Sequence, residues 1–174
     1  EQPTVDPALS SGIINILVLG SDQRQSADFR TDVIVLVSLN PATGRVALIS
    51  FPRDLYVEIP YWGYDRINTA MEYGGFVMMA NTFETNFGVR PSHYVLTNFQ
   101  SFVTIINSLD GIDINASQAL TDKCKLPEAV GGYCTFGPGP VHLTGEAALW
   151  YVRSRYSTSD FDRTRRAQEV LLGL

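Results

Sequence analysis

Two groups of charged residues could bind a phosphorylated ligand, and the first group lies between residues 22 and 54. Arginine presents a planar fork that binds phosphate through two parallel hydrogen bonds, and it outnumbers lysine by 11 to 2 in this chain. Two aspartates that bracket one loop could also hold a hard cation such as Mg²⁺, which prefers oxygen ligands. A solvated loop with surface ion pairs would explain the same spacing, and a compositional bias would explain the excess of arginine. The members of this first charged group are Asp22, Arg24, Arg30, Asp32, Arg53 and Asp54.

The second charged group lies near the end of the chain. Arg153 and Arg155 are two positions apart, so their side chains face the same side only if the chain is extended there. If both bind one anion, the preceding helix must end near Tyr151. Arg163 and Arg166 are three positions apart, which places them on one helical face close to a helix N-terminus that favours phosphate. Ion pairs with the aspartates of the same segment are the alternative explanation.

The overall composition predicts one globular domain and argues against nucleic-acid binding. The chain has 174 residues, of which 45% are hydrophobic and 18% are charged, as is typical of a domain with its own core. Its formal net charge of −5 is opposite to the basic face that nucleic-acid binding requires. No apolar run reaches the length of about 18 residues that indicates a membrane span.

Strands are the elements that must position the first charged group. Apolar, β-branched runs predict strands over 13–19, 33–39 and 46–51, with a shorter one over 56–59. If the first three strands form a meander, the end of the first, the start of the second and the end of the third lie at one edge of the sheet. Loops at strand ends commonly carry functional residues. The meander would therefore gather the first charged group at that edge.

The second half of the chain mixes helices with short strands. Helical patterns cover 76–87 and 99–109, and later ones run from a Thr144 cap to about residue 151 and from about residue 162 onward. Short strands are predicted over 94–97 and 112–114, and the glycines and prolines of 115–140 predict loops. This order of elements predicts an α/β or α+β sandwich around one sheet. The apolar side chains of the first two helices fit an ordinary core, and they also fit the wall of a slot for a lipid chain.

The two cysteines, Cys124 and Cys134, flank a segment that contains consecutive glycines. No other cysteine or nearby histidine could complete a zinc site with them. A disulfide that closes a surface hairpin is the favoured interpretation, and it would indicate an oxidising compartment. Two unrelated thiols are the alternative.

Several short motifs occur in a characteristic order along the chain. They are residues 16–24 (ILVLGSDQR), 30–32 (RTD), 50–54 (SFPRD), 65–68 (DRIN), 143–149 (LTGEAAL), 151–155 (YVRSR) and 160–163 (DFDR), followed by Arg166 and Gln168. Over residues 13–174 the chain thereby resembles the LytR–CpsA–Psr family of bacterial envelope proteins. The segment with the two cysteines is not a general feature of that family.

The resemblance implies an α/β fold, namely an αβα sandwich with a central mixed β-sheet flanked by helices and an apolar pocket for a prenyl chain. It implies that Asp22 and Asp32 lie near Mg²⁺. The catalytic residues would be Arg53, Asp54, Arg153 and Arg155. The residues that bind pyrophosphate would be Arg24, Arg30, Arg53, Arg153, Arg155, Arg163 and Gln168.

The resemblance also implies a phosphotransferase that moves a glycopolymer, such as teichoic acid, from a polyprenyl-pyrophosphate carrier onto peptidoglycan or another wall acceptor. Residues 1–12 would be a linker from an N-terminal membrane anchor, and residues 13–174 would be the catalytic domain on the extracellular face of the cytoplasmic membrane. A sugar hydroxyl would attack the phosphorus next to the glycan, with Asp54 or a metal-linked Asp22 accepting its proton. The alternatives are a polyprenyl-pyrophosphate hydrolase or carrier-binding protein, and an envelope-linked regulator without transferase activity.

Overall fold

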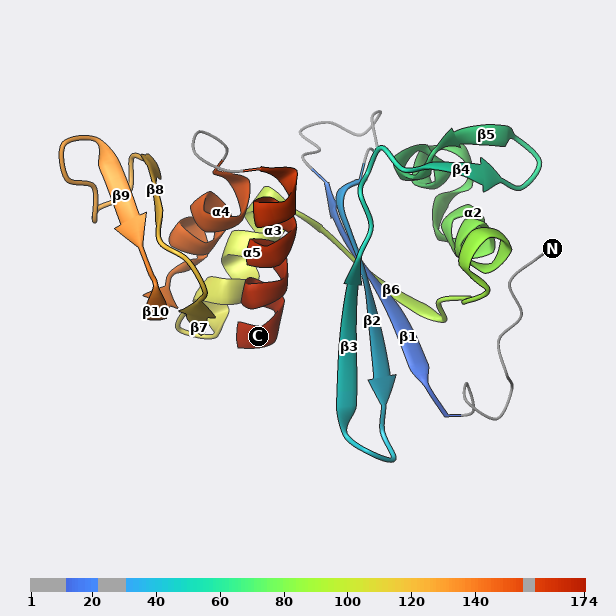
Figure 1. Cartoon of the computed structure of the whole chain (residues 1–174), viewed down its shortest axis with the longest axis horizontal. Helices are drawn as coiled ribbons and strands as arrows, with labels where there is room; N and C mark the ends of the chain where they lie inside the picture. Colours follow the sequence, from blue (N-terminus) through green and yellow to red (C-terminus); the bar gives the residue numbers. More distant parts are fainter. Residues whose placement is uncertain (1–11, 22–30, 155–158) are drawn as a thin grey trace. The chain divides into compact units, whose positions relative to one another are not determined.

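The chain forms two compact units, residues 1–98 and residues 99–174, which are described one after the other. The computed structural model describes residues 12–21, 31–154 and 159–174, and Figure 1 labels their helices and strands. Within these ranges no helix is long and apolar enough to cross a membrane.

The first unit is built on a mixed β-sheet with the strand order β3-β2-β1-β6 in the described residues. Strands β1 (Ile14–Ser21), β2 (Thr31–Asn40) and β3 (Arg45–Ser50) form an antiparallel meander, and β6 (His93–Asn98) pairs with β1 in parallel. The predicted meander and the predicted α/β class with a central mixed sheet are confirmed.

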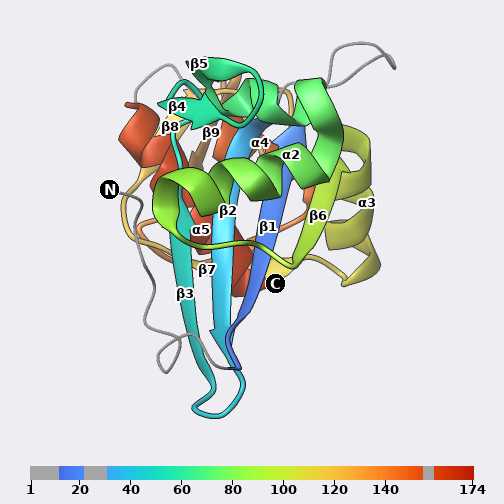
Figure 2. The ribbon, with the colours of Figure 1, turned by 90° about the vertical axis from the view of Figure 1, so that its right-hand side faces the viewer.

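Helix α2 (Ala70–Phe87) lies across one face of this sheet, as Figure 2 shows. Its buried Met79 and Phe83 pack against leucine and isoleucine side chains of β1 and β2 in one apolar cluster. These two side chains are therefore ordinary core residues, whereas Val77 on the same helix is 63% exposed.

Helix α2 begins earlier than the predicted residue 76 and contains a kink. The kink lies at Gly74 and Gly75, and Gly75 has a φ of +61°, in the left-handed region that glycine adopts without a steric penalty. The apolar pattern that predicted a helix from residue 76 therefore marks the straight part of α2 beyond the kink. Gly88 ends the helix in the left-handed conformation, which is common at helix C-termini.

A hairpin of β4 (Tyr56–Ile59) and β5 (Gly63–Arg66) follows β3 and leads into the short 3-10 helix η1 (Ile67–Thr69). Its Val57 and Ile59 side chains are buried in the cluster below α2. The main chain then returns to the start of the hairpin, where the amide of Ile67 donates to the carbonyl of Leu55 at 2.8 Å. The hairpin thereby fixes the segment that carries residues 53 and 54.

The second unit packs three helices against short strands. Helix α3 (Phe99–Ser108) precedes β7 (Ile112–Ala116), which pairs in antiparallel fashion with β10 (Gly139–Leu143); α4 (Gly145–Arg153) and α5 (Asp160–Gly173) follow. One buried apolar cluster joins these elements, with Ile106, Leu143, Tyr151 and Val170 among its members. Thr144 caps α4 as predicted, because its hydroxyl accepts a hydrogen bond from the amide of Ala147 at 3.3 Å.

The prediction of loops over 115–140 was wrong where three short strands form. Strands β8 (Leu120–Lys123) and β9 (Tyr133–Phe136) pair in antiparallel fashion, and β10 starts at Gly139. Four-residue strands between glycines and prolines carry too few residues to show a periodicity of two clearly. The alternation becomes visible once their partners are known, because Leu120, Asp122 and Cys134 are all buried.

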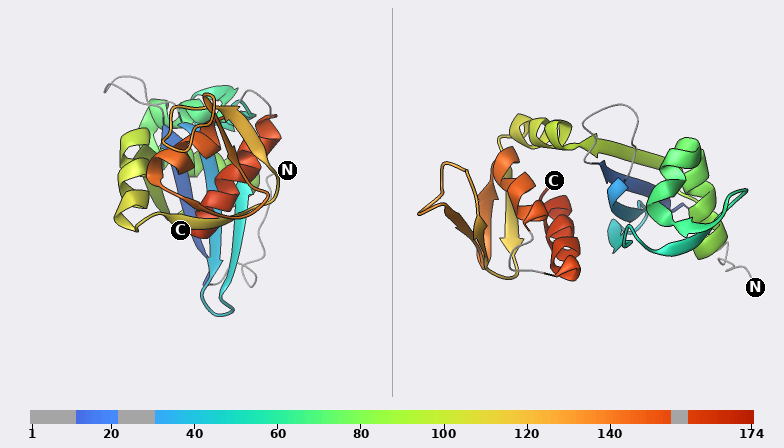
Figure 3. Two further views of the ribbon diagram at one scale, coloured as in Figure 1. Left: turned by 90° about the vertical axis from the view of Figure 1, so that its left-hand side faces the viewer. Right: turned by 90° about the horizontal axis from the view of Figure 1, so that it is seen from above.

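The disulfide between Cys124 and Cys134 closes this β8–β9 hairpin, with 5.7 Å between the two Cα atoms. The pairing agrees with the sequence-based prediction. Cys134 is buried and the amide of Cys124 donates to the carbonyl of Gly132 at 3.0 Å. The hairpin lies on the opposite side of α4 from α5 (Figures 1 and 3).

Replacing both cysteines by serine should lower the free energy of unfolding of the second unit by about 2–3 kcal/mol, since the cross-link restricts the unfolded chain. The chain has two tryptophans, Trp62 in the first unit and Trp150 in the second. In a Trp62→Phe background, the fluorescence of Trp150 reports urea unfolding of the second unit. Reduction of the parent protein should reproduce the loss, and an unchanged unfolding midpoint in both experiments would contradict the prediction.

Glu169 of α5 connects three elements of the second unit through its carboxylate. Tyr151 of α4 donates to it at 2.6 Å, and the amide and hydroxyl of Ser117, just beyond β7, donate at 3.1 and 2.6 Å. Burial by itself would raise the pKa of Glu169, but the hydrogen bonds from Ser117 and Tyr151 outweigh it, so the pKa lies below its ordinary value of 4.5.

This lowered pKa predicts an acid-sensitive second unit. A carboxyl group whose pKa is lower in the folded state stabilises the fold above its unfolded pKa, and the contribution is lost as the pH falls through the folded pKa. We expect the Trp150-reported unfolding midpoint to decrease as the pH falls below about 4.5. Glu169→Gln should cost about 1–3 kcal/mol at pH 7 and make the acid decline shallower. An equally steep decline in that variant would assign the acid sensitivity to other groups.

Candidate functional site

The predicted edge of the first sheet exists. Ser21 at the end of β1 pairs with Thr31 at the start of β2, and Ser50 at the end of β3 pairs with Val35 of β2. The amide of Phe51 then donates to the carbonyl of Ile34 at 2.9 Å. The antiparallel register therefore brings the residue that starts β2 and the residues that follow β3 to one edge.

Arg53 lies at this edge between two carboxylates. Its Nη1 contacts Asp32 at 2.5 Å and its Nε contacts Asp54 at 3.2 Å. Asp54 in turn pairs with Arg66 at 3.5 Å, so opposite charges alternate along the row Asp32, Arg53, Asp54 and Arg66. Three of these four residues belong to the first charged group, and the structure brings them together as predicted.

The carboxylates fix the orientation and the charge of the Arg53 guanidinium. The hydrogen bond to Asp32 is the largest cause of a raised pKa for Arg53, and burial opposes it only in part. The main chain is also held, since the amide of Asn68 donates to the carbonyl of Arg53 at 3.3 Å. The Arg53 side chain is 38% exposed, so a permanent, oriented positive charge remains accessible to an anionic ligand.

Arg66 is a site residue that sequence reasoning missed. It lies opposite Tyr56 in the β4–β5 hairpin and reaches Asp54 from there. The motif at residues 65–68 carries part of the family resemblance, but its local sequence predicts no role for the arginine. Arg66 comes close to Asp54 because β5 pairs in antiparallel fashion with β4. The spacing of residues along the sequence does not predict this contact.

The predicted metal pair lies only partly within the described residues. Asp32 is 29% exposed at its side chain and pairs with Arg53, whereas Asp22 lies outside those residues, as do Arg24, Arg30 and Arg155. In the ranges that the structure covers, no group of three His, Cys, Asp or Glu residues could hold a metal ion. The Mg²⁺ site at Asp22 and Asp32 stays a prediction.

Arg153 of the second unit is the last residue of α4, and the chain leaves the helix at Ser154 with φ −55° and ψ 134°. The helix was predicted to end near Tyr151 and ends two residues later, and Ser154 itself has an extended backbone. The guanidinium of Arg153 lies 4.1 Å from the ring centroid of Phe99, at a distance typical of a cation–π contact. Arg153 is exposed, so it too can reach a ligand.

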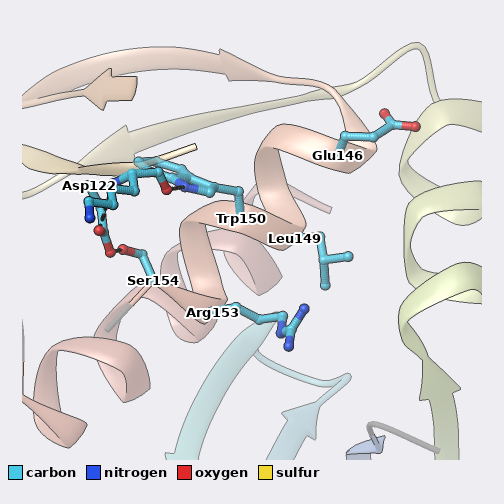
Figure 4. A pocket seen from close by; sticks show the side chains of 7 residues that line it. Asp122, Glu146, Leu149, Trp150, Arg153 and Ser154 are labelled. Carbon is cyan, nitrogen blue, oxygen red and sulfur yellow. Dashed lines mark hydrogen bonds between the residues drawn. The ribbon is translucent and has the colours of Figure 1, made fainter. Parts of the chain in front are cut away.

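An open hollow of about 300 Å³ lies beside Arg153 in the second unit, and Figure 4 shows its side chains. Most of its surface is apolar. In Figure 4 the side chains of Asp122 and Ser154 lie close together, and the guanidinium of Arg153 points away from them. The residues that line it are Asp122, Lys123, Glu146, Leu149, Trp150, Arg153 and Ser154. The hollow could accommodate part of a ligand whose charged group contacts Arg153.

Helix α5 carries Arg163 and Gln168, both partly buried, and the fully buried Arg166. The spacing of Arg163 and Arg166 suggested a shared anion site, but Arg166 binds main-chain carbonyls instead. It donates to the carbonyl oxygens of Tyr151, Ser154 (2.8 Å) and Asp162 (3.2 Å). Burial lowers the pKa of Arg166 below its ordinary value, but the guanidinium stays charged. Arg166 is therefore a structural residue of the second unit.

The N-terminus of α5 is occupied by one of its own aspartates. The Ser159 hydroxyl accepts from the amide of Asp162, and the Asp162 carboxylate accepts from the amide of Ser159 at 3.0 Å. This capping box neutralises the positive end of the helix locally. Hydrogen bonds from Ser159 also keep the pKa of Asp162 low, so a phosphate near this helix would depend on arginine side chains.

Known proteins define the class to which this site belongs. The LytR_cpsA_psr family model matches residues 1–174, and the chain belongs to the LytR–CpsA–Psr family. It is 32% identical over 168 residues to the regulatory protein MsrR of Staphylococcus aureus (strain COL), covering 95% of this chain and 49% of that protein. It is 34% identical over 166 residues to the polyisoprenyl-teichoic acid–peptidoglycan teichoic acid transferase TagU of Oceanobacillus iheyensis, covering 91% and 49%.

Solved structures show the same fold. The chain superposes on Bacillus subtilis TagV with a TM-score of 0.77 at 28% identity, covering 92% of this chain and 63% of that one. It superposes on the LytR-CPS2A-psr family protein YwtF (TagT) with bound octaprenyl pyrophosphate lipid with a TM-score of 0.71 at 30% identity, covering 98% and 66%. The chain spans about half the length of the curated relatives it matches.

Proposed function

We propose that this domain is a phosphotransferase that moves a glycopolymer from a polyprenyl-pyrophosphate carrier onto peptidoglycan or another cell-wall acceptor. The observation that carries the proposal is Arg53, which two carboxylates hold at the sheet edge as an oriented, accessible positive charge. Family membership supports it, as do a relative named as a teichoic acid transferase and a related structure with bound octaprenyl pyrophosphate.

In the proposed reaction an acceptor hydroxyl oxygen attacks the phosphorus next to the glycan. The bond from this phosphorus to the bridging oxygen breaks, and polyprenyl phosphate leaves with the electron pair. Negative charge develops on the phosphoryl oxygens, and Arg53 together with Arg153 would stabilise it. The acceptor proton passes to a carboxylate, and Asp54 is the described candidate because it is 57% exposed at its side chain and adjoins Arg53.

Arg24, Arg30, Arg155, Arg163 and Gln168 complete the proposed pyrophosphate site. Within this proposal, Arg53 and Arg153 also belong to the residues that bind pyrophosphate. Arginine suits this role because its fork can bind two oxygens of one phosphate while its neighbours bind the other.

Mg²⁺ belongs to the same proposal, with Asp22 and Asp32 as its protein ligands. An Mg²⁺ ion would supply neutralisation of charge on the phosphoryl oxygens. Asp32 fits such a site because its carboxylate is partly exposed, and its second oxygen is not the one that contacts Arg53 at 2.5 Å. The arginine orients the carboxylate in either case.

We further propose that the domain acts on the extracellular face of the cytoplasmic membrane, joined by the linker 1–12 to an N-terminal membrane anchor. The disulfide of the β8–β9 hairpin supports this placement, because disulfides persist in oxidising compartments.

Incubation of the protein with a radiolabelled polyprenyl-pyrophosphate-linked glycan and purified wall fragments tests the proposed activity. Label that becomes covalently attached to the wall supports transfer. Release of free glycan phosphate with no label on the wall would identify a hydrolase instead. Chelation of divalent cations should suppress wall labelling and added Mg²⁺ should restore it; transfer that is insensitive to chelation would remove Mg²⁺ from the mechanism.

A regulatory role is the second candidate, because one relative is named regulatory protein MsrR. The net charge of −5 argues against direct contact with DNA. A sequence-specific, salt-sensitive shift of DNA by the purified domain would favour the regulator, whereas wall labelling without any DNA shift would favour the transferase.

A further inference from the structure

Ser154 has an unusual environment for a residue between two arginines of a proposed binding site. Its neighbour Arg153 is exposed, but Ser154 itself is only 7% exposed. It is also the C-cap of α4, where the chain changes from helical to extended. The contacts of Ser154 therefore determine how the end of α4 that carries Arg153 is held.

Asp122 of β8 holds Ser154 from the side of the hairpin. The carboxylate is 6% exposed and accepts hydrogen bonds from the Ser154 hydroxyl and from the amide of Lys123, the latter at 2.7 Å. Figure 4 shows the two side chains close together among the residues that line the hollow, which also include Arg153. Burying a carboxylate is costly unless hydrogen bonds compensate. On the same buried face of β8, Leu120 is apolar, so the buried position of residue 122 does not by itself require a carboxylate.

Two further contacts hold the same turn of α4. The indole of Trp150 donates to the carbonyl of Lys123 at 2.9 Å, and the guanidinium of Arg166 donates to the carbonyl of Ser154 at 2.8 Å. The end of α4 is thus fixed by the disulfide-closed hairpin on one side and by α5 on the other. Among these contacts, the hydrogen bond to Asp122 is the one that the Ser154 side chain donates, next to Arg153.

We propose that Asp122 is a positioning residue for pyrophosphate binding, acting through Ser154 to fix the main chain next to Arg153. The inference rests on the proposed function, because that function assigns Arg153 to the ligand. It also gives the β8–β9 hairpin a role, which is to brace the arginine-bearing end of α4. Arginines on a fixed main chain bind a diphosphate without first having to be ordered, so the brace acts on affinity.

The test compares binding of farnesyl pyrophosphate and of farnesol to the whole 174-residue chain by calorimetry. Asp122→Ala should weaken farnesyl pyrophosphate binding about tenfold, as expected when a group that orients a binding residue is lost, and should leave farnesol binding unchanged. Asp122→Asn retains an acceptor oxygen for Ser154 and should recover most of the affinity. Thr135→Ala is the matched control on the same hairpin, since it removes an exposed cross-strand hydrogen bond to Thr121, and it should bind like the parent.

Unchanged farnesyl pyrophosphate affinity in a folded Asp122→Ala variant would overturn the positioning role. An equal loss for farnesol would also overturn it, because the effect would then be general. If Asp122→Ala does not fold, Ser154→Ala carries the test, since it removes only the donor and should show the same selective loss. Failure of the parent protein to bind farnesyl pyrophosphate would instead count against the proposed function, so the two failures are distinguishable.

Discussion

Arg53→Ala should abolish glycan transfer while the first unit stays folded. The variant loses an oriented guanidinium that is 38% exposed and leaves Asp32 and Asp54 without their shared partner. In the complex with the ligand, removal of the arginine from a desolvated arginine–phosphate pair costs about 2–5 kcal/mol, so we expect transfer to fall by roughly 30- to 5,000-fold. Stability should change by less than about 1 kcal/mol, because the ion pairs are partly solvated.

Wall labelling and farnesyl pyrophosphate affinity measure the effect, and circular dichroism establishes that the variant is folded. Arg53→Lys keeps the charge without the planar fork and should recover only part of the activity. Arg45→Ala is the control, because Arg45 lies at the opposite end of β3 and should be neutral. Near-normal transfer by Arg53→Ala would remove Arg53 from the mechanism.

Arg166→Ala should destabilise the second unit by about 3–5 kcal/mol, the scale for removal of a buried charged partner. The side chain is 1% exposed and donates to carbonyls of Tyr151 and Ser154. Each buried carbonyl that loses its donor adds about 1–3 kcal/mol of desolvation cost. We therefore expect partial unfolding at room temperature, which would reduce transfer as a secondary effect.

Urea unfolding followed by Trp150 fluorescence in the Trp62→Phe background measures this loss. Arg166→Met keeps most of the volume without the donors and separates packing from hydrogen bonding. Arg165→Ala is the matched control on the neighbouring residue, whose side chain is 28% exposed and pairs with the partly exposed Asp162. Because this ion pair is partly solvated, the control should cost less than Arg166→Ala. If Arg166→Ala were fully stable but bound farnesyl pyrophosphate poorly, Arg166 would belong to the ligand site after all.

Sequence patterns predicted the structure correctly where a single segment contains all the residues that define the element. The β-branched runs of the first three strands and the short turn between the second and third predicted the meander, and the meander placed Asp32, Arg53 and Asp54 at one edge. The pairing of the two cysteines followed from their number and separation. The sequence did not predict the short strands β8 and β9, because four residues are too few to establish an alternation of buried and exposed side chains.

The amino-acid sequence by itself determined the family, the order of most elements and the residue types available for phosphate chemistry. It did not determine which arginine serves which purpose. The spacing of Arg163 and Arg166 suggested one shared anion site, but Arg166 donates to the main-chain carbonyls of Tyr151 and Ser154. Likewise, Arg66 reaches Asp54 through a hairpin, and Asp122 reaches Ser154 across 32 positions of sequence. Burial and hydrogen-bond partners arise from contacts between distant segments, and only the tertiary structure brings those segments together.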